Sequence, residues 1–71
     1  MAESVYKVIE LIGTSTESWE KAARTVVETA AKTLQDLRVA EVVAQDVHIE
    51  NGKVVAYRVK VKLSFKYHGE E

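Results

Sequence analysis

The chain has 71 residues, of which 10 are basic and 11 acidic, and its formal net charge is −1 at pH 7, so no overall attraction to nucleic acid or to a membrane surface is expected. It contains no cysteine, which excludes disulfides and thiolate metal sites. No apolar run approaches the roughly 20 residues of a membrane helix, and no signal-peptide pattern is present, so we expect one cytoplasmic domain spanning residues 1–71.

Residues 5–12 are rich in β-branched side chains and predict a first strand. Apolar residues fall on both faces of this strand, as is typical of a sheet that is covered on each side. Gly13 is expected to end the strand, and Thr14, Ser15 or Thr16 to cap the helix that follows.

Residues 16–36 predict an amphipathic helix whose small apolar side chains allow close packing against a sheet. Trp19 lies at the start of the apolar stripe, where a packing role is favoured over ligand stacking. The stripe consists of Trp19, Ala22, Ala23, Val26, Val27, Ala30, Ala31, Leu34 and Leu37.

Residues 38–49 and 54–67 predict two further strands, joined by a tight hairpin turn at Asn51-Gly52. The last strand alternates strictly between apolar and polar residues, which indicates one dry and one wet face. Its length of about 45 Å exceeds the roughly 28 Å diameter of a compact chain of this size. The strand must therefore bend or pair with another subunit, and we expect the second.

A two-residue turn at Asn51-Gly52 also predicts the pairing between these two strands. The predicted pairs are Arg38–Phe65, Ala40–Leu63, Glu41–Lys62, Val42–Val61, Val43–Lys60, Ala44–Val59, Gln45–Arg58 and Val47–Ala56. The helix should cover the face that carries Ala40, Val42 and Ala44. The opposite face carries a valine row without cover in the chain: Val39, Val43 and Val47.

The order β-α-β-β, together with the residues that fill it, resembles the dodecins. The resemblance covers residues 5–65, and its main pieces are residues 10–15 before the helix, residues 40–42 in the second strand, and residues 57–65 in the third. It implies an α+β fold in which a three-stranded antiparallel sheet packs one helix on one face. It also implies a hollow homododecamer that is not an enzyme and that stores or sequesters a small ligand.

Known dodecins mostly bind flavins, which stack on a tryptophan just before the segment that matches residues 40–42 and bond to a glutamine on the third strand. Here Val39 and Arg58 stand at those positions, and Gln45 is predicted to share their face. Binding of riboflavin or FMN should therefore be weakened. Residues 18–20, 38–40 and 57–58 look most like the calcium dodecin branch, which makes calcium the more favoured ligand.

The candidate metal ligands are Asp46, Glu50 and Glu41, whose oxygen atoms suit calcium. Asp46, His48 and Glu50 alternate along one strand, so they form either a solvated edge or a metal site that a neighbouring subunit completes.

The basic row of the third strand, Arg58, Lys60, Lys62 and Lys66, is either a solvated face partly neutralised by Glu41 or an anion site at a symmetry axis. No nucleophile, base and orienting group occur together, so no catalytic residue is predicted. The alternative to ligand storage is a structural or interaction protein with no bound cofactor.

Overall fold

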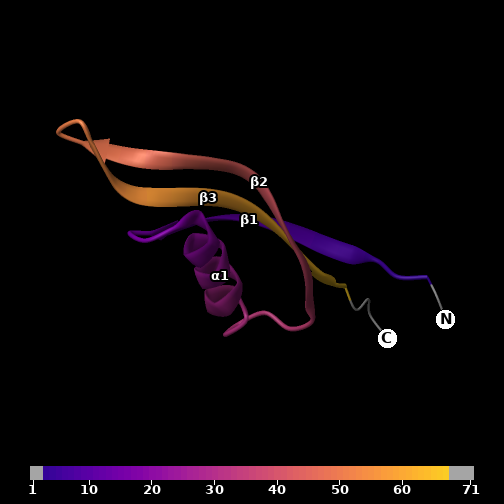
Figure 1. Cartoon of the computed structure of the whole chain (residues 1–71). Coiled ribbons are helices and arrows are strands. Elements are labelled where there is room, and N and C mark those ends of the chain that lie inside the picture. Colours follow the sequence, from indigo (N-terminus) through magenta and orange to yellow (C-terminus); the bar gives the residue numbers. More distant parts are fainter. Residues whose placement is uncertain (1–2, 68–71) are drawn as a thin grey trace.

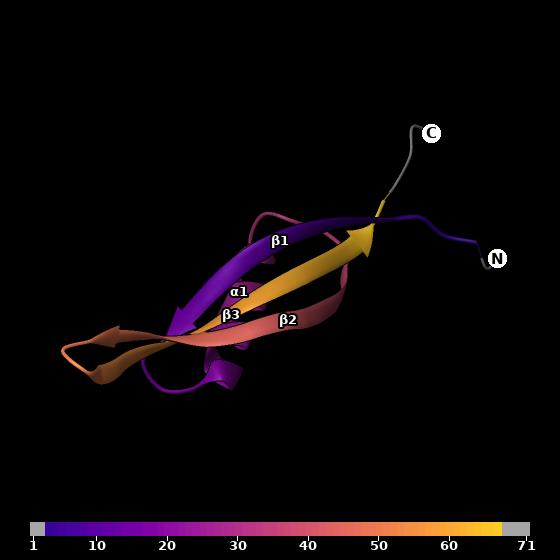
Figure 2. The same cartoon turned by 90° about the horizontal axis from the view of Figure 1, so that it is seen from above.

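The computed structural model describes residues 3–67 and contains one helix and one three-stranded sheet (Figure 1). In chain order the elements are β1 (Tyr6–Ser15), α1 (Trp19–Ala30), β2 (Leu37–Glu50) and β3 (Lys53–Lys66). The sheet is antiparallel with the order β1-β3-β2, so β3 is the central strand (Figure 2). The α+β fold predicted from the sequence, with one helix on one face of the sheet, is confirmed.

The helix begins three residues later than predicted, because Ser18 is its N-cap. The Ser18 hydroxyl accepts a hydrogen bond from the backbone N–H of Lys21 at 3.0 Å, which satisfies one of the free donors in the first turn. Ser15 instead stabilises the preceding turn, where its Oγ accepts from the N–H of Glu17 at 2.9 Å. The prediction of Thr14, Ser15 or Thr16 as the cap was therefore wrong.

The helix also ends earlier than residue 36, at Ala30. The N–H of Leu34 still bonds to the Ala30 carbonyl at 2.9 Å, but within a turn and no longer within a helix. Asp36 then adopts a left-handed backbone conformation with φ of 60°, which directs the chain into β2. This early turn brings Leu34 and Leu37 against the core, whereas a straight helix would carry the chain away from the sheet.

The core lies between α1 and the helix-facing side of β1 and β3, while β2 has little helix cover. The buried apolar residues are Ala22, Val26, Ala30, Val59, Val61 and Leu63. Gly13 pairs with Val59 inside β1 and does not end this strand as predicted. It allows the close approach of the helix, because a Cβ atom at Gly13 would lie 2.3 Å from Cγ2 of Val26.

The predicted hairpin register is confirmed beside the turn, for Ile49–Val54 and Glu50–Lys53, and again for Val39–Ser64, Ala40–Leu63, Glu41–Lys62 and Val42–Val61. It fails between these two stretches and beyond Val39. Val43 has no partner, and the pairs that follow it are Ala44–Lys60, Gln45–Val59, Asp46–Arg58, Val47–Tyr57 and His48–Ala56. At the other end Leu37, not Arg38, is opposite Phe65. A β-bulge adds one residue to one strand and shifts the pairing by one. Val55 on β3 and Val43 on β2 both lack a partner, so these two irregularities displace only the pairs between them.

The bulge changes which β2 side chains face the helix. Ala44 pairs with Lys60 and points away from the helix, so its predicted place under the helix is wrong. Val47 pairs with Tyr57 on the helix side and leaves the predicted valine row. Val39 and Val43 remain exposed, at 59% and 39%.

The described chain is elongated, with extents of 54 × 21 × 16 Å. Its radius of gyration is 14.7 Å, against about 11 Å for a compact domain of 71 residues. The β2–β3 hairpin projects past the end of β1, and no other part of residues 3–67 packs around its tip (Figure 1). In the described part of the chain the only helix has 12 residues, too few to cross a bilayer, which takes about 20.

Candidate ligand face of the sheet

The sheet surface that faces away from α1 is called the open face below. Its residues alternate along β3 with the buried residues Val59, Val61 and Leu63, and cross-strand partners share a face. The open face consists of Tyr6, Val8, Glu10, Ile12 and Thr14 on β1, Arg58, Lys60, Lys62, Ser64 and Lys66 on β3, and Val39, Glu41, Ala44 and Asp46 on β2.

Arg58 and Asp46 form a two-pronged ion pair on this face. Arg58 donates from Nε to Oδ1 of Asp46 at 2.7 Å and from Nη2 to Oδ2 at 2.9 Å. The hydrogen bonds and charge of Arg58 lower the pKa of the Asp46 carboxyl, and the same contacts raise the pKa of Arg58. Both groups are therefore ionised at neutral pH, and the paired geometry is the strongest that a guanidinium makes with a carboxylate.

Asp46 is also fixed from the helix side. The indole Nε1 of Trp19 donates to the backbone carbonyl of Asp46 at 3.0 Å. The Trp19 ring packs edge to face on Tyr57, with 5.0 Å between ring centroids and 72° between planes. The predicted packing role of Trp19 is confirmed, and this contact joins the start of α1 to the backbone of the ion pair.

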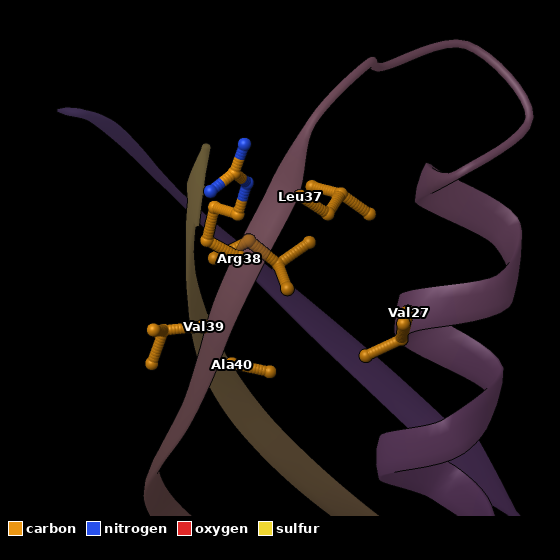
Figure 3. Close-up of a pocket in the computed structure, with 6 residues that line it drawn as sticks. Val27, Leu37, Arg38, Val39 and Ala40 are labelled. Carbon is orange, nitrogen blue, oxygen red and sulfur yellow. The ribbon is translucent and has the colours of Figure 1, made fainter. Parts of the chain in front are cut away.

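Val39 points away from the helix, while Ala40 beside it points towards the helix (Figure 3). Val39 is opposite Ser64, whose hydroxyl donates to the Val39 carbonyl at 3.4 Å. On the helix side a shallow apolar hollow of about 150 Å³ lies between Val27 and β2 (Figure 3). Val39 therefore presents an exposed aliphatic surface on the open face.

The basic row of β3 is partly neutralised in the structure. Lys62 has Glu10 on one neighbouring strand and Glu41 on the other, and Arg58 has Asp46. Among these basic residues Lys60 lies between two apolar partners, Ile12 and Ala44. The open face therefore carries an alternation of charged and apolar rows and is not a continuous cationic strip.

The three candidate metal ligands do not gather within one chain. Asp46 is bonded to Arg58, Glu41 is opposite Lys62, and Glu50 contacts Nε2 of His48 at 3.3 Å. Within residues 3–67 no three carboxylate or imidazole groups are close enough to share a metal ion. A calcium site built from these residues would need ligands from more than one chain.

The predicted position of Gln45 opposite Arg58 is wrong, and the structure places Asp46 there. Gln45 instead is opposite the buried Val59, on the side of the sheet that faces the helix. Counting from the turn, the pairing shifts by one at Val55 and returns to the predicted register at Val43, and neither irregularity has a distinct sequence signal. A search for the acid that best complements Arg58 would have found Asp46, one position beyond the predicted partner.

These features define a small βαββ protein whose sheet packs one helix on one side and exposes a face of mixed charge on the other. Residues 5–68 match the dodecin family over nearly the whole chain, and the chain belongs to this family. Dodecins are small ligand-binding proteins.

Three relatives illustrate the similarity. Calcium dodecin of Mycobacterium tuberculosis strain H37Rv is 48% identical over 63 residues, which are 89% of each chain. Dodecin from Streptomyces coelicolor has a TM-score of 0.90 and 34% identity, covering 99% of this chain and 100% of that chain. A crystal structure of the M. tuberculosis calcium dodecin, described as a calcium-chelating antigen with a novel calcium-binding site, has a TM-score of 0.82 and 44% identity, covering 96% of this chain and 97% of its own.

Proposed function

We propose that this chain is a non-enzymatic subunit of a hollow homododecamer that sequesters a small ligand or ion. The observation that carries the proposal is the uncovered apolar surface of an elongated chain. On the open face Val8, Ile12 and Val39 are 54%, 56% and 59% exposed. A monomer rarely leaves this many large apolar side chains exposed on one face, so further copies of the chain would cover them. A single domain over residues 1–71 and a cytoplasmic location stay predictions.

The proposed ligand is calcium in preference to flavin. Two observations support this choice: the similarity to the proteins named calcium dodecin, and the absence of an aromatic ring at Val39. We propose Asp46, Glu50 and Glu41 as ligands contributed by several chains, since calcium takes 6–8 oxygen atoms. Asp46 is the weakest of the three, because Arg58 already bonds to both of its carboxylate oxygens.

Assembly and ligand can be tested together on the purified protein. Light scattering should give a mass about twelve times the 7.9 kDa of one chain. Elemental analysis after dialysis against micromolar calcium should find bound calcium, and a Glu41→Gln, Glu50→Gln double variant should lose it while keeping its mass. A Glu28→Gln variant, changed on the outer side of the helix, is the control for the loss of a carboxylate.

A mass near that of one chain would refute the assembly. Calcium that stays bound in the Glu41→Gln, Glu50→Gln protein would refute the proposed ligands. An assembled protein with neither calcium nor flavin absorbance would favour a purely structural role.

Flavin affinity is expected to be low, with riboflavin bound at least about tenfold more weakly than by a dodecin that has the stacking tryptophan. Stacking on an aromatic ring contributes roughly 0.5–1.5 kcal/mol beyond area burial, and Val39 offers no such ring. Arg58 donates hydrogen bonds but accepts none, so it cannot replace a glutamine that does both. Val39→Trp combined with Arg58→Gln should recover part of the affinity in a fluorescence quenching titration.

Val39→Leu is the matched control for this titration, because it adds apolar volume without a π face. Strong quenching of riboflavin by the unmodified protein at sub-micromolar concentration would contradict the expectation. An equal gain in riboflavin affinity from Val39→Leu and Val39→Trp would also contradict it.

A further inference from the structure

The ion pair between Arg58 and Asp46 lies beside a hollow in the open face. The hollow has a volume of about 170 Å³, and its lining residues are Ile12, Ala44, Asp46, Arg58, Val59 and Lys60. The small side chain of Ala44 is part of its lining, because the bulge at Val43 turns Ala44 to this face of the sheet. Two cations, Arg58 and Lys60, therefore border one hollow, and Asp46 is hydrogen-bonded to the first and lies within electrostatic range of the second.

Asp46 limits what Arg58 can offer to a ligand. Of the five N–H donors of a guanidinium, the two that point at Asp46 are in use. The charge of Arg58 is also balanced at a distance of 2.7 Å. An anion that approaches the hollow meets a neutral pair at this point, and it can reach the three remaining N–H donors of Arg58 only next to the negative charge of Asp46.

We propose that Asp46 sets the charge selectivity of this hollow: it holds and neutralises Arg58, so that phosphate-bearing ligands are disfavoured, and without its carboxylate Arg58 and Lys60 act together as an anion site. Asp46 is thus a selectivity residue that acts through Arg58. The inference rests on the proposed function, since it assumes that the open face receives the ligand. It explains why an exposed arginine on a ligand face need not select an anion.

The test compares riboflavin with FMN, which differs from it by one phosphate group. The ratio of the two dissociation constants is measured by fluorescence titration for the unmodified protein and for Asp46→Asn, which keeps the shape of the side chain and removes its charge. We expect Asp46→Asn to shift the ratio about tenfold towards FMN, the size of one charge-assisted hydrogen bond. The shift should shrink at high salt, because the two cations are partly exposed.

Two controls separate a local effect from a general change in charge. Glu10→Gln makes the same change in net charge on the same open face but does not touch Arg58, and it should leave the ratio within about twofold. The double variant Asp46→Asn, Arg58→Gln should not show the shift of the ratio towards FMN. Asp46→Ala also removes the carboxylate, and it should shift the ratio in the same direction as Asp46→Asn if the latter fails to assemble.

An equal shift in Glu10→Gln, or a shift that survives without Arg58, would overturn the inference. So would an assembled Asp46→Asn protein that binds neither flavin. None of these results touches the proposed function, which depends on the assembled mass and on bound calcium.

Discussion

Replacing Gly13 with alanine is expected to destabilise the fold by about 3 kcal/mol or more, at the upper end of what overpacking costs. The new Cβ atom would lie 2.3 Å from Cγ2 of Val26 and 2.6 Å from the backbone carbonyl oxygen of Ala22. A side chain can rotate to relieve the first contact, but the second involves the helix backbone. The whole of α1 would have to move away from β1, which opens the core between them.

Thermal unfolding at a fixed chain concentration would measure this effect, since the stability of an oligomer depends on concentration. Adding Val26→Ala to Gly13→Ala should restore only part of the loss, because the Ala22 carbonyl remains in place. Gly52→Ala is the comparison: its Cβ meets no atom within 4 Å, but its φ of 74° costs about 1 kcal/mol for a residue with a side chain. If Gly13→Ala destabilised the protein no more than Gly52→Ala does, the close contact between α1 and β1 at Gly13 would be refuted.

Replacing Leu63 with alanine should cost about 2–5 kcal/mol, the range for removing a large aliphatic side chain from a core. Leu63 is 1% exposed and is the largest fully buried side chain of the described residues. It lies on the central strand, with Ile9 on one side and Ala40 on the other, so neighbours on both strands lose contacts. At roughly 4–8 °C per kcal/mol for a domain of this size, the unfolding midpoint should fall by at least about 8 °C.

Leu63→Met is the matched control, because it keeps the volume of the side chain and should cost less than about 1.5 kcal/mol. Circular dichroism melts of the two variants would separate loss of volume from loss of shape. Equal losses in both would show that the cost does not come from a cavity at position 63.

Several features of this protein followed from local sequence patterns. The period-two alternation of the last strand and the Asn51-Gly52 turn predicted the hairpin, because both signals depend only on neighbouring residues. The stripe with Ala22, Val26 and Ala30 predicted which side of the helix is buried, and these are the helix residues found in the core. The substitutions at Val39 and Arg58 could likewise be seen in the sequence, by comparison with the family pattern.

Features that depend on contacts between distant segments required the tertiary structure. The helix ends at Ala30 because the chain must turn back to form β2. Position 13 requires a glycine because the helix lies so close to β1 there. The irregularities at Val43 and Val55 are decided by how two long strands fit together, and the shift between them places Asp46, not Gln45, opposite Arg58. One extra residue in a strand changes no local propensity but shifts the pairing until a second irregularity restores it, which is why the turn alone did not predict that Asp46 lies opposite Arg58.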